Sequence, residues 1–285
     1  MENLSVLLYI KRFFVKKLFN HIKETILYLW RFYICGTIPP IASKPEDPVD
    51  DTIDETVEEP EINEEEMIEP GRKNVVVCLD NGHGDNTPGK RSPWSACKVP
   101  PELPFREYAY CREIVSRLAK VLHDDGFPVY IVTPEETDIT LAERGKRINN
   151  VVADAKADGK HTISISIHNN AAGNGREWKK AYGWSVWTTP GQNNSDKLGQ
   201  CLYDAAKEIL TPLGQKTRHD TSDGDDDYEA NFAMCRMPKC PAVLTENMFQ
   251  DCIDEVEFLL TEEGKNAIVE IHRRGIEKFV EMMGW

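Results

Sequence analysis

The sequence of 285 residues lacks a long apolar run. No charge-free window approaches the roughly 20 apolar residues of a membrane-spanning helix. Residues 25–43, with Arg31 as their single charge, are the nearest candidate. The mean hydropathy of −0.48 excludes a protein with several membrane spans.

Basic charge and cysteine are also scarce. There are 34 Lys and Arg against 48 Asp and Glu, a net charge of −14. This balance argues against a nucleic-acid partner, which requires a basic surface that displaces counterions from phosphates. Eight cysteines without a CxxC pair predict neither a disulfide scaffold nor a cysteine zinc site, and they leave the redox compartment open.

The charge is distributed over three regions. Residues 1–43 carry a net +4 and residues 44–70 a net −12, which leaves −6 for residues 71–285. The middle region has thirteen acidic residues, four prolines and few large apolar side chains. We therefore expect a disordered acidic linker at 44–70 and a folded domain at 71–285.

The first region is apolar and basic. Arg12, Lys16, Asn20 and Lys23 recur at helical spacing and form a narrow polar stripe on a wide apolar helix. This amphipathic pattern suits a membrane surface. An export signal and a helix that packs on a partner remain as alternatives.

From residue 71 onward, strand and helix patterns alternate. This alternation predicts an α/β fold, a mostly parallel, doubly wound sheet with helices on both faces. The expected strands are residues 74–79, 127–133, 162–167, 182–188 and 242–245. The expected helices are residues 106–124, 140–157, 195–210 and 262–282.

Ionisable residues follow three of these strands. His83, His168 and Glu246 each come just after a strand ends, and the carboxyl ends of parallel strands form the edge where ligands bind. Two imidazoles and a third protein ligand suit zinc and leave one position for water. Glu107 is the preferred third ligand, with Asp80 and Asp85 as alternatives.

Each residue also has a purely structural interpretation. His83 lies in a glycine loop and is compatible with a turn, and His168 is compatible with a capping role. Glu107 at a helix start is compatible with a charge that favours the helix dipole. Glu246 ends an apolar strand, where an unpartnered carboxylate is costly, so it is the strongest functional candidate.

The motifs of residues 74–285 resemble the zinc-dependent N-acetylmuramoyl-L-alanine amidases of the amidase type 3 family, which are peptidoglycan hydrolases of bacteria and phages. The matching pieces are Asp-x-Gly-His-Gly at 80–84, a Glu at 107, Leu-Ala-Glu-Arg at 141–144, Ser-x-His-x-Asn-Ala at 166–171, and the Glu-containing strand at 241–249. The sequence departs from the family at Met248, usually Gly, and at Cys252, often Asn.

The resemblance implies that His83, Glu107 and His168 bind one zinc ion and that Glu246 is the catalytic carboxylate. The reaction expected is hydrolysis of the amide between muramic acid and L-alanine by a zinc-activated water. Glu246 would remove the water proton and return it to the leaving amine.

Substrate contacts are expected around this site. Asn169 and Asn170 would orient His168 or donate to the oxyanion, with loop capping as the alternative. The long segment between residues 84 and 107 suggests a wall of the active site, with Arg91 and Trp94 as contacts. Arg218 or Arg236 would hold a stem-peptide carboxylate.

The acidic stretch at residues 222–231 could be read as a calcium-binding loop. Its spacing lacks the EF-hand pattern and the terminal Glu of that motif, so the sequence favours a solvated acidic loop.

Three functions stay open from the sequence: a zinc amidase, a zinc peptidase or carboxypeptidase acting on stem peptides, and a noncatalytic wall-binding or structural module. Peptidoglycan is the expected partner, and the oligomeric state is open. The helix at 1–43 predicts a protein tethered to a membrane in the cell envelope. The alternative is a phage-type lysin that reaches the wall from the cytoplasm during lysis.

Overall fold

The computed structural model describes residues 73–93 and 104–285. The expected N-terminal helix at 1–43, the acidic linker at 44–70 and Trp94 lie outside the described residues. Within that part of the chain, none of the helices combines the length and the apolar character that crossing a bilayer requires.

The core element is a six-stranded sheet in the order β2-β1-β3-β6-β4-β5. Strands β1, β2, β3 and β6 are parallel, whereas β4 runs antiparallel to β6. The strands are β1 (Val75–Asn81), β2 (Val129–Ile131), β3 (His161–Asn170), β4 (Ser185–Thr188), β5 (Tyr228–Glu229) and β6 (Ala242–Phe249). The mostly parallel sheet expected from the sequence is confirmed.

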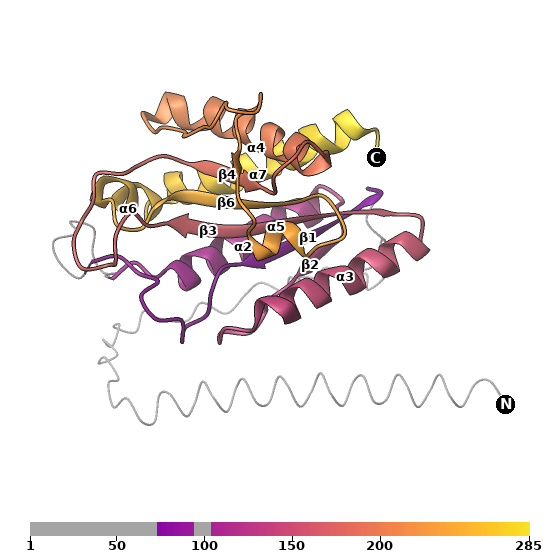
Figure 1. Cartoon of the computed structure of the whole chain (residues 1–285), viewed down its shortest axis with the longest axis horizontal. Coiled ribbons are helices and arrows are strands. Elements are labelled where there is room, and N and C mark those ends of the chain that lie inside the picture. The colour runs from indigo at the N-terminus through magenta and orange to yellow at the C-terminus, as the bar shows by residue number, and fades with distance from the viewer. Residues whose placement is uncertain (1–72, 94–103) are drawn as a thin grey trace, which may run out of the picture. The chain divides into compact units, whose positions relative to one another are not determined.

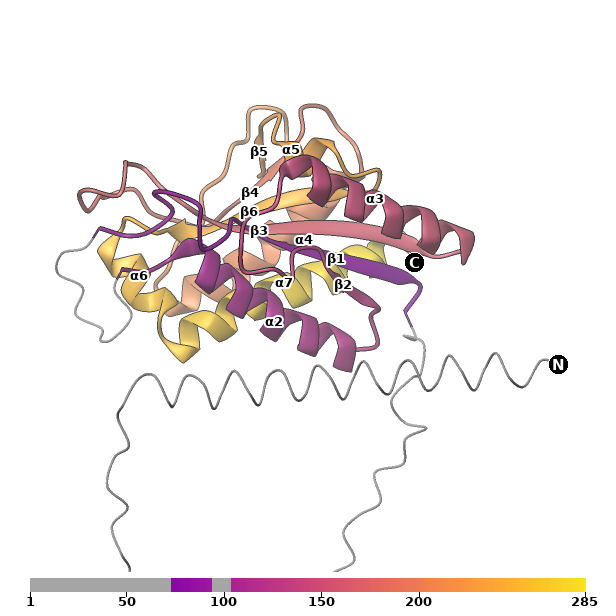
Figure 2. The ribbon, with the colours of Figure 1, turned by 90° about the horizontal axis from the view of Figure 1, so that it is seen from below.

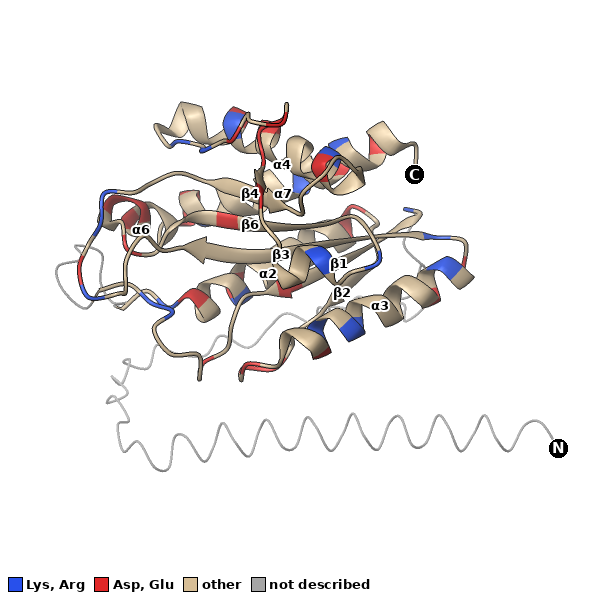
Figure 3. Cartoon of the chain, in the orientation of Figure 1, with Lys and Arg blue, Asp and Glu red and all other residues tan. Residues whose placement is uncertain are grey.

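The helices cover both faces of this sheet. Helices α2, α4 and α7 lie on one face, and α3 and α5 lie on the other (Figures 1 and 2). Their bounds are α2 (Glu107–Asp124), α3 (Leu141–Ala157), α4 (Asn194–Leu210), the 3-10 helix η2 (Thr211–Leu213), α5 (Ala233–Arg236), α6 (Ile253–Leu259) and α7 (Glu262–Met283). Basic and acidic residues are interspersed along these helices (Figure 3).

Local signals explain where the helices begin and end. The Thr140 hydroxyl accepts a hydrogen bond from the Glu143 backbone N–H at 3.2 Å and caps α3. Asn193 and Asp196 form a capping box at the start of α4. After α2, Gly126 adopts φ 87°, a left-handed conformation that glycine tolerates and that ends the helix.

The strand residues alternate between two apolar layers. Val75, Val77 and Leu79 of β1 belong to the large core under α2, α4 and α7. Cys78 belongs to a smaller core with Ile148 of α3. The sheet is therefore buried on both faces.

Candidate metal centre and active site

Two of the predicted residues occupy one rung of the sheet. His168 of β3 and Glu246 of β6 are register partners in parallel strands. Partners in such a ladder project to the same face, so these two side chains are neighbours. The sequence placed both residues just beyond their strands, but β3 continues to Asn170 and β6 to Phe249. Backbone pairing therefore fixes both residues more firmly than a loop would.

The neighbouring strand β1 positions His83, which lies two residues beyond the end of that strand. His83 has φ 64°, a left-handed conformation rare for histidine. The preceding Gly82 allows a close approach, because a Cβ at that position would lie 2.5 Å from the His168 ring. The two imidazole rings consequently meet edge to face, with centroids 4.9 Å apart.

Glu107 joins the two histidines from the opposite face of the sheet. It is the first residue of α2 and is fully buried. Its Oε1 lies 3.1 Å from His168 Nδ1 and 3.3 Å from His83 Nε2. The three residues each offer one ligand atom, and these atoms all lie within 4.8 Å of one another, close enough to share a metal ion.

The donor set fits a metal. His83 Nε2 is buried, and its polar neighbour is Glu107 Oε1 at 3.3 Å, a contact without good hydrogen-bond geometry that leaves the nitrogen available to a metal. Burial lowers the pKa of His83, which favours the neutral imidazole that coordinates metals. Burial alone would raise the pKa of Glu107, but hydrogen bonds with His168 and His83 hold it below its usual value. The carboxylate is therefore ionised and available as a ligand.

Glu246 lies beside this triad and is electrostatically distinct from it. Its Oε2 is buried without a hydrogen-bond partner. Burial raises the pKa of Glu246 to about 7; the charge of His168 opposes this shift, whereas that of Glu107 adds to it. A carboxylate with a pKa near the working pH is suited to accept and return a proton.

The two alternative ligands, Asp80 and Asp85, do not join this group. Asp80 is fully buried and accepts hydrogen bonds from Thr133 at 3.0 Å and from Ser166 at 2.6 Å. Asp85 is exposed and lies outside the group of His83, Glu107 and His168. Glu107 is therefore the third member of the triad.

Arg144 is a residue of this region whose role the sequence did not predict. Its guanidinium donates to Asp80 Oδ1, the Asn81 carbonyl and Asp138 Oδ1, each at 2.7 Å. It also reaches the carbonyl of His83 at 3.4 Å. Arg144 thus ties α3 to the loop that carries a predicted ligand.

Replacing Arg144 by Met is expected to lower the free energy of unfolding by about 3–5 kcal/mol, because it leaves the buried Asp80 charge without its partner. The side chains of Arg144 and Asp80 are 2% and 0% exposed, so solvent screens this pair little. Urea unfolding measures the change. The exposed pair of Lys120 and Asp124 provides the control, and Lys120→Met should cost less than about 1 kcal/mol. Equal losses in the two variants would contradict this role.

The sequence also did not predict a role for Gln250. Its Nε2 donates to Glu107 Oε2 at 2.7 Å and so orients the carboxylate. No periodic or motif signal marks it, since it lies after the end of β6. Its position next to the Glu-containing strand is the only hint that the sequence offers.

The two asparagines predicted as substrate contacts differ in their surroundings. The Asn169 side chain is buried and donates to the Asn247 carbonyl at 2.5 Å. The Asn169 backbone N–H donates to Glu107 Oε1 at 3.2 Å. Asn170 is half-buried, and its side chain accepts from the Ala171 N–H at 2.8 Å. Asn169 thus supports the triad from inside the protein, and Asn170 remains the candidate substrate contact.

The arginines lie at different places around the edge. The Arg218 guanidinium stacks 5.1 Å from the ring of Phe249, at the carboxyl end of β6. Arg91 is half-buried and forms an isolated bridge with Arg106, next to Glu107. Arg236 is exposed in α5, which precedes the amino end of β6. Arg218 and Arg91 therefore remain candidates, whereas Arg236 is remote from the triad.

The structure gives a reason for the unusual residue at position 248. Met248 adopts φ 65° at a β-bulge, where the register of β3 and β6 shifts between His168 and Asn170. A left-handed conformation favours glycine, so the methionine carries a steric cost of roughly 1–2 kcal/mol. Its side chain is fully buried in the large core, which offsets that cost.

The fold and this site define a class of protein. An α/β domain that gathers two imidazoles and two carboxylates at the carboxyl edge of parallel strands has the features of a metal-dependent hydrolase.

The comparisons with known proteins identify the family. Residues 77–278 match the N-acetylmuramoyl-L-alanine amidase family, and the chain belongs to it. The endolysin of Bacillus phage SPP1 is 26% identical over 209 residues, which cover 73% of this chain and 66% of that protein. The chain therefore spans just under two thirds of the length of this relative.

Two solved structures show the same fold. The N-acetylmuramoyl-L-alanine amidase from Clostridium difficile 630 is 23% identical, with a TM-score of 0.59, over 73% of this chain and 97% of that one. The amidase AmiC2 of Nostoc punctiforme is 20% identical, with a TM-score of 0.54, over 73% and 98%. The doubly wound architecture is thus shared with known amidases.

Proposed function

We propose that this protein is a zinc-dependent N-acetylmuramoyl-L-alanine amidase that cleaves the amide between N-acetylmuramic acid and the L-alanine of the stem peptide. The observation that carries this proposal is the convergence of His83, Glu107 and His168 with Glu246 beside them. Membership of the amidase family supports the choice of bond.

Zinc is the metal that suits two imidazole nitrogens and one carboxylate oxygen with a position left open. When bound, it supplies Lewis-acid polarisation of the substrate carbonyl and of a water molecule. The histidines need to be neutral to bind it, and the low pKa of Glu107 keeps its charge available.

Glu246 performs the proton transfers. With a pKa of about 7, its carboxylate accepts the proton of the attacking water and then donates it to the leaving amine of L-alanine. His168 faces it across one rung of the sheet and keeps this proton carrier next to the metal ligands.

The substrate is held by groups on the rim. Arg218 is suited to pair with a carboxylate of the stem peptide, because its guanidinium is stacked against Phe249 and Tyr228 at 5.1 and 5.5 Å. Arg91 and Asn170 are the proposed contacts on the side of Glu107. These assignments rest on position at the edge of the sheet.

The similarity to a phage endolysin supports a lysin that acts on the cell wall. The amphipathic pattern of residues 1–43 adds the proposal that this segment binds a membrane surface. Comparing the membrane fractions of cells that express the full chain and a chain without residues 1–43 tests the tether. Equal distribution of the two chains would contradict it.

Mass spectrometry of digested peptidoglycan tests the bond. The zinc-loaded full chain is expected to release intact stem peptides with a free L-alanine amine and glycan strands with a free lactyl carboxyl group. Release of single amino acids with the lactyl amide intact would instead identify a peptidase. Binding to the wall without any cleavage would identify a noncatalytic module, and either result would overturn the proposal.

A further inference from the structure

A second cluster of possible metal ligands lies outside the amidase site. Asp196, Asp225 and Asp227 each bring a carboxylate oxygen to within 4.8 Å of the others. Asp196 is in the first turn of α4, and the other two belong to the loop before β5, whose acidic residues stand out in Figure 3. Thr188, the last residue of β4, lies between them.

This arrangement corrects the expectation of a solvated acidic loop at residues 222–231. Asp223 and Gly224 are exposed, but Asp227 is 1% exposed, and Asp196 is 4% exposed. The chain therefore turns two carboxylates of the cluster inward, where an ionised group requires compensation.

The hydrogen bonds at Thr188 do not supply that compensation. Its hydroxyl is in contact with Asp196 Oδ1 at 3.1 Å and also, closely, with Asp227 Oδ2. A hydroxyl has one proton to donate, so it can satisfy only one of these two oxygens. The other contact brings two electron-rich oxygens together unless a proton on a carboxyl group or a bound cation lies between them.

Two further carboxylate oxygens of the cluster also lack a compensating donor or positive charge. Asp227 Oδ1 and Asp225 Oδ1 are buried without a hydrogen-bond partner. Within residues 73–93 and 104–285, no Lys, Arg or His forms an ion pair with any of the three aspartates. Lys197, which lines a pocket together with Asp196 and Asp225, is exposed and donates to Asn194 at 3.1 Å.

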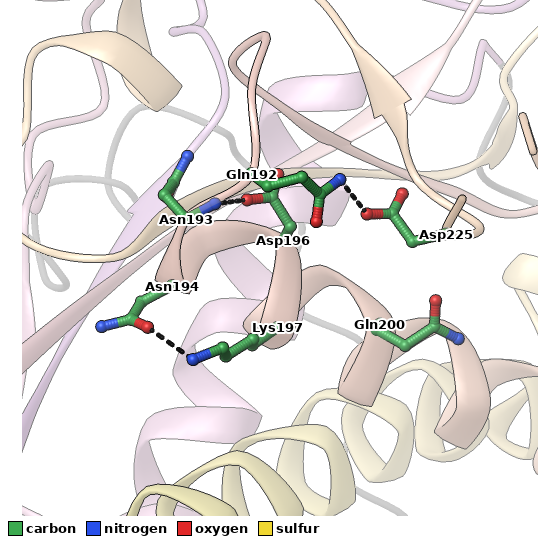
Figure 4. Close-up of a pocket in the computed structure, with 7 residues that line it drawn as sticks. All are labelled: Gln192, Asn193, Asn194, Asp196, Lys197, Gln200 and Asp225. Carbon is green, nitrogen blue, oxygen red and sulfur yellow. Dashed lines mark hydrogen bonds between the residues drawn. The ribbon is translucent and has the colours of Figure 1, made fainter. Parts of the chain in front are cut away.

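We propose that Asp196, Asp225, Asp227 and Thr188 form a binding site for one Ca²⁺ ion. Carboxylate and hydroxyl oxygens are ligands for hard cations, and the cluster offers neither the nitrogen nor the sulfur that zinc favours. A pocket of about 360 Å³, lined by Asp196, Asp225 and five other residues with polar side chains, adjoins the cluster (Figure 4). It leaves room for the water molecules that complete the six to eight oxygens of a calcium shell.

This site is separate from the amidase centre. Strand β4 is antiparallel to β6, with Ser185 opposite Glu246 and Trp187 opposite Leu244. Thr188 therefore lies near the amino end of β6, roughly 10 Å along the strand from the rung of Glu246. Bound Ca²⁺ would tie the loop before β5 to the start of α4, so its role is structural and does not depend on the proposed hydrolysis.

Calorimetric titration of the zinc-saturated full chain with CaCl₂ in metal-free buffer tests this site. We expect one Ca²⁺ per chain, and Asp225→Asn and Asp227→Asn should each weaken binding by about tenfold or more, because each removes a ligand charge. Asp226→Asn is the matched control, because it removes the same charge from the residue between the two proposed ligands. The Asp226 carboxylate accepts a hydrogen bond from Gln200 at 3.1 Å and does not belong to the cluster. Its affinity should stay near that of the parent.

Hydrogen exchange provides a second readout. Ca²⁺ should slow amide exchange in residues 220–229 of the parent and of Asp226→Asn, and it should not do so in Asp225→Asn. Absence of Ca²⁺ binding by the parent would show that a proton on Asp227 is sufficient, and it would overturn the proposal. So would equal weakening in all three variants, or loss of Ca²⁺ binding in Glu107→Gln, which would move the ion to the amidase centre.

Discussion

Glu246→Gln is expected to lower kcat by at least about 10²–10⁴-fold while the protein still binds one zinc ion per chain. The amide has nearly the shape of the carboxylate but cannot accept the water proton. Glu246 is also outside the triad of His83, Glu107 and His168, so zinc binding does not require it. Release of stem peptides from purified peptidoglycan measures the rate, and metal analysis measures the zinc content.

Glu177→Gln is the matched control for this substitution. Glu177 is exposed, lies in the loop after β3 and pairs only with Lys179, at 3.3 Å. The same chemical change there should leave the rate near that of the parent. A Glu246→Gln protein with parental activity would show that another group carries the proton.

The second large effect is expected at Glu107. Glu107→Gln should remove zinc from the purified protein and abolish cleavage, because a neutral amide replaces the only anionic member of the triad. The loss of zinc affinity should exceed the roughly 10–100-fold change that follows loss of an outer-shell partner. Titration with zinc against a competing chelator provides the affinity.

Gln250 supplies the graded comparison for Glu107. Gln250→Met removes the hydrogen bond to Glu107 Oε2 and a longer one, 3.3 Å, to the Asn169 carbonyl, but it leaves the carboxylate of Glu107 in place. Its zinc affinity should fall by about 10–100-fold with the metal still bound at saturation. Equal zinc affinity in Glu107→Gln and in the parent would exclude Glu107 as a ligand. Circular dichroism of both variants verifies that the fold is retained.

Much of the fold could be predicted because its signals are local. Apolar periodicity marked the long helices, and β-branched runs marked the parallel strands. The direction of β4 has no such signal, since a short strand reads the same in either orientation. The two-residue β5 and the four-residue α5 are stabilised by tertiary packing rather than by any pattern of their own.

The candidate site likewise has one part that could be predicted from the sequence and one part that could not. His83, His168 and Glu246 follow strand patterns, so their gathering at one edge could be predicted from topology. The inward turn of Asn169, the role of Gln250 and the burial of Asp227 depend on which partners the folded chain places opposite them. Contacts between residues far apart in the sequence produce no local sequence pattern from which they could be predicted.

The shared rung of His168 and Glu246 has a consequence for how this enzyme can diversify. The separation of the two residues is inherited from the regular spacing of neighbouring strands, about 4.7–4.9 Å, and not from any loop. Changes in the loops that follow these strands would therefore leave the two side chains in alignment. A slip of one residue between β3 and β6 would do the reverse, because it turns the carboxylate to the other side of the sheet. The loops around the site can thus vary in sequence, whereas the register of β3 and β6 tolerates almost no drift.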